Sequence, residues 1–284
     1  MTPALSGEVA IVTGASAGIG AAVAAALARE GAIVVLAARR AERLQRVADA
    51  ITSSGGDALP VVADVTSAED RRRLVDSALA VAGRVDILVN NAGYGQRGPV
   101  EAIPVERIRE NFETNVFGAI ALIQLVAPHM RSRRRGRIVN VSSLAGRIAR
   151  PYSSTYDATK HALEAFSDGL RAELRAFGIH VVVIEPGFTR TEFAQVAAAR
   201  ELVSAPYAAA LEAFTAAEAT RRRFAVDPDR VARQVVRAAV TSAPRSRYVT
   251  PAAARVVLLL KRVLPDRFFD RLVVAAPAVS QHRP

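Results

Sequence analysis

Residues 8–31 read EVAIVTGASAGIGAAVAAALAREG, and the architecture expected of the whole chain starts from this segment. The apolar run 8–14 predicts a buried strand. Residues 18–31 carry apolar side chains at helical spacing and end on Gly31, a residue type that commonly terminates helices. Between strand and helix the glycines are spaced G-x-x-x-G-x-G. A glycine-rich turn in this position predicts a dinucleotide-binding loop, where backbone N–H groups and the helix N-terminus receive a pyrophosphate.

The same alternation continues along the chain. Runs rich in Val, Ile and Ala predict further strands at 32–38, 58–65, 84–93, 136–143, 179–187 and 245–251, and helical spacing predicts helices at 41–56, 67–83, 105–130, 154–178 and 227–240. Ser67 and Asp227 are the expected N-caps, the latter followed by Pro228 as first helical residue. Strands this apolar are buried on both faces. The sequence therefore predicts a Rossmann-like, doubly wound α/β fold, with a seven-stranded, mostly parallel sheet and helices on both faces.

Domain organisation follows from the absence of an internal repeat or linker before residue 251. Residues 1–250 are predicted to form a single dinucleotide-binding catalytic domain, in which the Ala-rich stretch of about 190–223 is a substrate lid. Residues 251–284 form a C-terminal amphipathic extension, whose segment 253–278 combines apolar runs with basic residues. Two interpretations of that segment stay open. It packs on its own domain or across an oligomer interface, or it lies on an anionic membrane or over an apolar pocket.

Composition excludes several classes of protein. The chain has 284 residues and no cysteine, so disulfides, thiolate metal sites and a cysteine nucleophile are ruled out. The four histidines contain no i, i+4 pair, and no metal is expected. The net charge of +11 comes from arginines spread along the chain without interleaved aromatics, which argues against nucleic-acid binding. With no leader-like N-terminus and no long apolar run, a cytoplasmic protein is expected, with peripheral membrane contact through 253–278 as the alternative.

The charges after the second strand indicate which dinucleotide binds. Gly14, Gly18 and Gly20 provide the turn, the close backbone approach and the helix–strand packing that any dinucleotide needs. NAD is usually recognised by an acid at the end of the second strand. Here the segment reads LAARRAER, with Ala38 at that position followed by Arg39 and Arg40. Guanidinium groups suit the 2′-phosphate of NADP, so NADP (NADPH) is predicted and NAD is the alternative, since one arginine could instead face solvent.

The stretch YDATK, residues 156–160, contains one of only two lysines in the chain. Tyr156 and Lys160 are four residues apart on a predicted helix and share one face. An ammonium near a phenol favours the phenolate and lowers the pKa of the tyrosine towards working pH, which suits general acid–base catalysis. A compact ammonium on a flexible stem fits such a site better than the planar fork of arginine.

Taken together, these motifs resemble the short-chain dehydrogenase/reductase family across residues 8–250. The matching motifs, in order, are TGASAGIG (13–20), ADV (63–65), NNAG (90–93), NVFG (115–118), VNVSS (139–143), YDATK (156–160) and EPGFTRT (185–191). Charge indicates Arg39 and Arg40 as cofactor-binding residues. The other cofactor-binding residues that these motifs predict are Gly14, Ser16, Ala17, Gly18, Ile19, Gly20, Asp64, Val65, Asn91, Ala92, Gly93, Tyr156, Lys160, Pro186, Gly187, Thr189 and Thr191.

The resemblance also implies a mechanism. Ser143 and Tyr156 would donate hydrogen bonds to a substrate carbonyl oxygen, and Tyr156 would give the proton. Lys160 would lower the pKa of Tyr156 and bind the nicotinamide ribose, and Asn115 would organise a proton-relay water. The expected activity is NADP-dependent interconversion of a carbonyl and a primary or secondary alcohol. Three alternatives remain open. Ser143 could only cap a loop, a role that Ser142 could also fill, and Asn115 could be purely structural. The whole protein could also be a catalytically silent cofactor-binding sensor or scaffold.

Substrate contacts are expected around the chemistry. Besides Ser143, the predicted substrate residues are Leu144, Tyr152, Phe188 and Phe193, with Tyr94 and Gln96 nearby. Their apolar and aromatic character suggests a lipophilic small molecule.

The resemblance further implies a homodimer or homotetramer formed through the two long helices.

Overall fold

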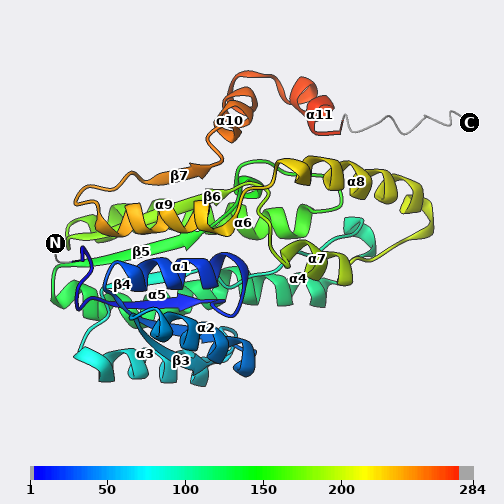
Figure 1. The fold of residues 1–284 in the computed structure, drawn as a ribbon. Coiled ribbons are helices and arrows are strands. Elements are labelled where there is room, and N and C mark those ends of the chain that lie inside the picture. Colours follow the sequence, from blue (N-terminus) through cyan, green and yellow to red (C-terminus); the bar gives the residue numbers. More distant parts are fainter. Residues whose placement is uncertain (1–2, 275–284) are drawn as a thin grey trace, which may run out of the picture.

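A single parallel sheet forms the centre of the protein, whose computed structural model describes residues 3–274 (Figure 1). Its seven strands lie in the order β3-β2-β1-β4-β5-β6-β7, and every neighbouring pair is parallel. The strands are β1 (Val9–Thr13), β2 (Ile33–Ala38), β3 (Asp57–Val62), β4 (Ile87–Asn90), β5 (Gly136–Val141), β6 (Ile179–Pro186) and β7 (Arg247–Thr250). The predicted doubly wound α/β fold is confirmed.

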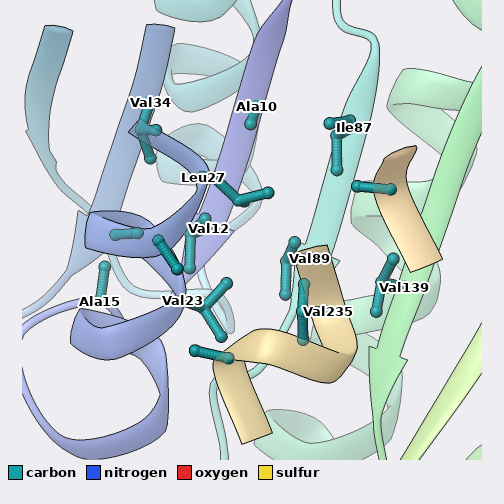
Figure 2. Packing of buried hydrophobic residues seen from close by; sticks show 14 of the residues in the cluster. Ala10, Val12, Ala15, Val23, Leu27, Val34, Ile87, Val89, Val139 and Val235 are labelled. Carbon is teal, nitrogen blue, oxygen red and sulfur yellow. The ribbon is translucent and has the colours of Figure 1, made fainter. Parts of the chain in front are cut away.

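Helices cover both faces of this sheet. One core layer is formed with α1 (Gly18–Arg29), α2 (Ala41–Ser53) and α9 (Pro228–Val240), and the other with α3 (Ala68–Ala82), α5 (Gly118–Ser132) and α6 (Ser154–Arg175). Successive strand residues alternate between the layers. In β1, Ala10 and Val12 point towards Val23 and Leu27 of α1 (Figure 2), whereas Val9 and Ile11 belong to the opposite layer. Both sets are fully buried, which is why the strand reads as continuously apolar.

The strand order reverses between β1 and β4, and this reversal sets the place of the site. One βα connection leaves β1 towards α1, and β4 continues into the opposite half of the sheet. At such a switch point the loops at the carboxyl ends of the strands diverge, which leaves a crevice in open α/β sheets. The glycine loop 13–20 follows β1 directly.

Some predicted boundaries are wrong. The single helix expected over 105–130 is divided into α4 (Val105–Phe112), a π-helical turn η2 (Glu113–Phe117) and α5. The strand expected over 84–93 ends at Asn90, because the next two backbone N–H groups bind the Thr13 side chain instead of a sheet neighbour. Asp227 precedes α9 as expected, but its carboxylate accepts from Arg190 Nε at 2.8 Å rather than capping the helix.

The predicted lid and C-terminal extension are both helical. The lid contains α7 (Phe193–Ala199) and α8 (Ala208–Arg221), and α8 buries Leu211, Phe214 and Glu218. Beyond β7, α10 (Ala254–Val263) and α11 (Asp266–Val274) stand off the edge of the sheet (Figure 1). None of the helices described is long and apolar enough to span a membrane. Residues 275–278 of the amphipathic segment lie outside the described residues, and the division at residue 250 stays a prediction.

Candidate active site

Thr13, the last residue of β1, joins the glycine loop to the segment after β4. Its hydroxyl accepts from the backbone N–H groups of Asn91 and Ala92, both at 3.0 Å, and Asn91 Nδ2 donates back to the Thr13 carbonyl at 2.9 Å. Gly14 has a φ of +66°, and a Cβ placed there would lie 2.8 Å from Asn91 Nδ2. A Cβ on Gly20 would lie 2.3 Å from the Gly14 carbonyl oxygen. Glycine is therefore required at both positions for the loop to pack this closely.

Tyr156 and Lys160 lie on α6 and are both buried. Lys160 Nζ donates to the Val141 carbonyl at the end of β5, at 2.9 Å, and lies 5.9 Å from the centre of the Tyr156 ring. Burial lowers the pKa of Lys160 to about 8, although the charge of Glu164 acts in the opposite direction. The ammonium is therefore hydrogen-bonded to a neutral carbonyl, and its lowered pKa lies only slightly above neutral pH.

The pKa of Tyr156 departs from the expectation. Burial raises it to about 12, and this effect outweighs the Arg150 guanidinium and the hydrogen bond of the Ser143 hydroxyl, which both lower it. The net change in this pKa is upward, opposite to the expected one, and Lys160 is not among its causes. Desolvation is the largest cause, and the positive charge that opposes it belongs to Arg150.

Ser143 both caps a short helix and lies at the Tyr156 phenol. Its hydroxyl accepts from the Ala145 N–H at 3.1 Å and so caps the short helix η3 (Leu144–Gly146), and it donates to the Pro186 carbonyl at 3.4 Å. A hydrogen bond from the same hydroxyl lowers the pKa of the Tyr156 phenol. The neighbouring Ser142 hydroxyl is buried and has no hydrogen-bond partner among the described residues.

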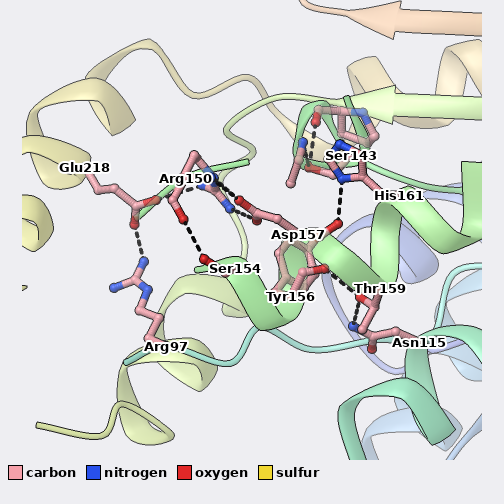
Figure 3. Close-up of polar contacts among 12 residues, drawn as sticks. Arg97, Asn115, Ser143, Arg150, Ser154, Tyr156, Asp157, Thr159, His161 and Glu218 are labelled. Carbon is pink, nitrogen blue, oxygen red and sulfur yellow. Dashed lines mark hydrogen bonds and ion pairs between the residues drawn. The ribbon is translucent and has the colours of Figure 1, made fainter. Parts of the chain in front are cut away.

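Asn115 lies in the π-helical turn η2, and its side chain makes three hydrogen bonds. Oδ1 accepts from the Tyr94 N–H, and Nδ2 donates to the Tyr94 carbonyl and to Thr159 Oγ1, all at 3.0 Å. Thr159 Oγ1 in turn donates to the Tyr156 carbonyl at 2.7 Å (Figure 3). The amide thus ties the segment after β4 to α6, as the structural interpretation expects, and its part in a proton relay stays a prediction. The π turn itself was missed, and such turns are often found at functional sites.

Two arginines after β2, Arg40 and Arg43, lie next to the glycine loop and Glu192. Arg40 donates to Ser16 Oγ from Nε and Nη2 at 3.3 and 3.1 Å, and it also pairs with Glu192 at 3.1 Å. Arg43, one turn further along α2, reaches the same carboxylate at 2.7 Å. The two guanidiniums hold the pKa of Glu192 below its usual range by hydrogen bonding. Sequence reasoning missed Arg43 and Glu192, although the i, i+3 spacing of Arg40 and Arg43 was a usable signal.

The other predicted cofactor residues lie around this crevice with different contacts. Arg39 instead faces Asp64 across 3.6 Å, and the Asp64 carboxylate accepts from the N–H and hydroxyl of Thr66. A Cβ on Gly18 would lie 3.0 Å from Thr191 Cγ2, which brings the loop after β6 against the glycine loop. The remaining members are near the carboxyl ends of β1, β3, β4 and β6: Ala17, Ile19, Val65, Gly93, Pro186, Gly187 and Thr189.

The predicted substrate residues do not all meet at Tyr156. The Phe193 ring, from lid helix α7, lies 5.3 Å from the Tyr156 ring, and Leu144 Cδ1 would be 3.2 Å from a Cβ on Gly187. Tyr152 instead packs against Phe214 of α8, with ring centres 5.6 Å apart. Other candidates have backbone or structural roles. The Phe188 carbonyl accepts from the Val226 N–H, Gln96 Nε2 donates to the Arg200 carbonyl, and the Tyr94 ring lies under the Arg200 guanidinium. Within residues 3–274 no group of acidic or histidine side chains is arranged to hold a metal.

Comparison with known proteins identifies the family of this chain. The family model described as short chain dehydrogenase matches residues 8–202. YbbO, an uncharacterized oxidoreductase of Escherichia coli K12, is 34% identical over 93% of this chain and 93% of its own. The chain belongs to the short-chain dehydrogenase/reductase family and is an oxidoreductase of that family.

Solved structures of the family contain both forms of the cofactor. One from Burkholderia phymatum, in complex with NAD, has a TM-score of 0.81 and 28% identity, covering 90% of this chain and 93% of its own. A metagenomic short-chain oxidoreductase in complex with NADP has a TM-score of 0.72 and 31% identity, covering 87% of this chain and 98% of its own. Membership of the family alone therefore does not decide between NAD and NADP.

The buried ammonium of Lys160 makes a testable difference to stability. The pKa of Lys160 is about 8 in the folded protein, and its ordinary value in an unfolded chain is 10.5. Between pH 8 and pH 10.5 the unfolded chain therefore binds more protons than the folded protein. Lys160 therefore lowers stability below pH 8, and this penalty disappears as the pH rises towards 10.5. Lys160→Met is expected to raise the free energy of unfolding at pH 7 by up to about 3 kcal/mol, with the gain shrinking above pH 8.

Urea unfolding of both proteins at pH 7, 8.5 and 10 measures this effect. Lys261→Met is the matched control, because Lys261 is partly exposed and pairs with Asp266 at 2.8 Å. A gain for Lys160→Met that stays constant with pH, or no gain at all, would contradict the buried cation.

Proposed function

We propose that this protein uses NADPH to interconvert a carbonyl group and a primary or secondary alcohol on a lipophilic small molecule. The observation that carries the proposal is the convergence of three side chains where β5 ends and α6 begins. Tyr156 and Lys160 come from α6 and Ser143 comes from the end of β5, and the hydroxyl of Ser143 acts on the Tyr156 phenol. Phe193 and Leu144 supply apolar surface next to them, which supports a lipophilic substrate.

The residues fit NADP, which would supply or accept the hydride when bound. Ser143 and Tyr156 would donate hydrogen bonds to the substrate oxygen and stabilise its developing negative charge. A pKa of about 12 keeps Tyr156 protonated at neutral pH, so it is a competent proton donor for reduction. Lys160 would bind the nicotinamide ribose, and the Arg150 charge would stabilise the phenolate left behind. Asn115 would keep Tyr156 in place through Thr159 and help to resupply protons.

The choice of NADP rests on charge. Ala38 leaves the end of β2 without a carboxylate, and Arg40 and Arg43 lie at the glycine loop with Glu192 as their acceptor. Two guanidiniums that already bind a carboxylate are suited to a phosphate. Glycine-loop residues such as Gly18 and Ser16 would receive the pyrophosphate.

Arg40→Ala and Arg43→Ala test the cofactor preference. A charge-assisted hydrogen bond contributes about 1.5–3 kcal/mol, so each variant is expected to raise KM for NADPH about tenfold or more and to leave KM for NADH within about twofold. Initial rates with each coenzyme measure this. Arg175→Ala, an exposed arginine at the C-terminal end of α6, is the control. An equal loss for NADPH and NADH would reject the 2′-phosphate contact.

Tyr156→Phe tests the chemistry. Loss of a general acid is expected to lower kcat by about 10²–10⁴-fold, while the Kd for NADPH stays within about twofold. The assay is NADPH oxidation against a panel of aldehydes, ketosteroids and long-chain ketones. Unchanged turnover, or a wild-type protein that binds NADPH and reduces nothing, would favour the cofactor-binding scaffold instead.

The pH profile provides a second readout of Tyr156. Oxidation of the alcohol needs the phenolate, whose pKa lies well above neutrality, so kcat/KM for oxidation is expected to rise about tenfold per pH unit between pH 6 and 8. Reduction needs the phenol and should lack this rise.

A cytoplasmic location and a homodimer or homotetramer remain predictions.

A further inference from the structure

A chain of buried ion pairs connects the lid to the first turn of the catalytic helix (Figure 3). Arg150 donates to the Asp157 carboxylate from Nε at 3.2 Å and from Nη2 at 2.7 Å, and its backbone N–H donates to the same group at 2.7 Å. Its remaining nitrogen, Nη1, donates to Glu218 of α8 at 2.9 Å. Glu218 also accepts from Arg97, which follows β4, and from Arg222 at 3.4 Å.

Burial makes these pairs mutually dependent. The side chains of Asp157 and Glu218 are 1% and 3% exposed, and that of Arg97 is 7% exposed. Removing one partner from a buried pair leaves an uncompensated charge, which costs far more than an exposed pair is worth. The lid helix, the segment after β4 and the start of α6 are therefore held in one arrangement by a single set of charges.

We propose that Arg150 is a positioning residue for the acid–base tyrosine, and that Glu218 makes its placement depend on the seating of the lid. Asp157 directly follows Tyr156, so the bidentate pair fixes the turn that carries the phenol. Glu218 fixes the other end of the guanidinium from α8, and Phe193 of α7 contacts the phenol ring from the same lid. This inference rests on the proposed function, because it concerns how Tyr156 is held and charged.

The surroundings of Tyr156 single out Arg150 as the charge to change. The charged groups that face the phenol or its charged neighbours are Arg150 and Asp157 beside it, His161 near Asp157, Lys160 one turn along α6 with Glu164 behind it, and Glu218 behind Arg150 together with Arg97 and Arg222. The uncharged neighbours of the phenol are Ser143 and Phe193. Of the charged ones, Arg150 lowers the pKa of Tyr156 and Asp157 raises it.

Arg150→Met is expected to move the rising limb of oxidation to higher pH by about half a unit or more, which lowers kcat/KM for oxidation at pH 7 about threefold or more. KM for NADP should stay within about twofold of wild type, because the guanidinium lies at the lid side of the tyrosine. Arg150→Lys retains the charge and loses the fork, so it should restore most of the pH profile but not all of kcat.

Two further variants separate positioning from simple stability. Glu218→Gln removes the anion behind Arg150 and is expected to raise KM for the carbonyl substrate and lower kcat without losing NADPH binding. Arg222→Met is the matched control. Arg222 pairs with Glu218 but is not hydrogen-bonded to Asp157, so this variant should leave the pH profile unchanged. If Arg150→Met does not fold, Arg150→Lys and Glu218→Gln still decide the question.

The outcomes are distinct from failure of the proposed function. Inactive wild-type protein, or a fully active Tyr156→Phe, would overturn the function itself. Active wild type with Arg150→Met and Glu218→Gln showing lower thermal midpoints, but wild-type pH profiles and KM values, would show that the ion pairs only stabilise the fold and would overturn the positioning role.

A second inference comes independently from the helices beyond β7. Val256, Leu259, Leu260 and Val263 of α10 form an exposed stripe at i, i+3, i+4 and i+7, whereas Ala254 faces inward and is buried. In α11, Phe268 and Leu272 are exposed one turn apart, with Phe269 buried. The described part of the domain therefore leaves these side chains uncovered, and packing across an oligomer interface stays a prediction.

Basic residues border these exposed side chains. Arg255, Arg262, Arg267 and Arg271 are all exposed, and the acids of the two helices are Asp266, which pairs with Lys261, and Asp270. An apolar stripe with cationic edges is complementary to a bilayer surface that carries negative headgroups. We infer that α10 and α11 form a docking surface for an anionic membrane.

Cosedimentation of the full chain with vesicles tests this surface. Binding is expected to phosphatidylcholine vesicles that contain phosphatidylglycerol, to weaken in high salt, and to be much lower with phosphatidylcholine alone. Arg262→Gln with Arg267→Gln should weaken it about tenfold or more, and Leu259→Asn should also weaken it. Val105→Asn, an exposed valine on α4, is the control. Absent binding, binding that ignores lipid charge, or a dimer in solution that Leu259→Asn dissociates would overturn the inference.

Discussion

Burial of the sheet on both faces is the constraint on which the rest of the molecule depends. Two core layers cover β1, β4, β5 and β6, so polar chemistry is confined to the ends of these strands. Two asparagines that enter the sheet are hydrogen-bonded to each other and to a helix: Asn90 Nδ2 donates to Asn140 Oδ1 at 2.9 Å, and Asn140 Nδ2 donates to Ser167 of α6 at 2.9 Å. These pairs link β4, β5 and α6 directly below the site. Tyr156 and Lys160 are thus carried by a helix that is fixed to the sheet by packing and by hydrogen bonds.

The same burial controls the charges. Taking an ionised group out of water is costly, so the buried acids of this chain are surrounded by arginines, as Asp86 is by Arg84 and Arg133 at 3.0 and 2.8 Å. Asp157 and Glu218 follow the same pattern with Arg150 between them. The consequence for the site is that its electrostatics extend into the lid. A tyrosine whose pKa is raised by desolvation depends on the nearest compensating cation, and that cation is held by groups from two different elements.

Sequence reasoning succeeded where the physical cause is local. Two-sided burial makes strands continuously apolar, and helices keep a 3.6-residue period, so the alternation predicted all seven strands and the helices α1, α2, α3, α6 and α9. It gave α4 and α5 as one helix and did not predict α7 and α8 of the lid. It failed where the cause is distant. The π turn at Asn115 is stabilised by Tyr94 and Thr159, which are 21 and 44 residues away, and Glu218 pairs with Arg150 across 68 residues. The pKa direction of Tyr156 was missed for a related reason, since spacing places a cation on the same face but does not measure burial.

The distribution of lysine and arginine follows from the partners that each site offers. All three side-chain nitrogens of Arg150 donate to carboxylates, so its planar fork and fixed charge are fully used. Lys160 has a single carbonyl as hydrogen-bond partner among the described residues. A guanidinium there would bring several N–H groups into a buried space without acceptors and would keep its charge at every accessible pH. An ammonium needs fewer partners and is already close to losing its proton, which makes it the cation that a buried proton-transfer site can hold.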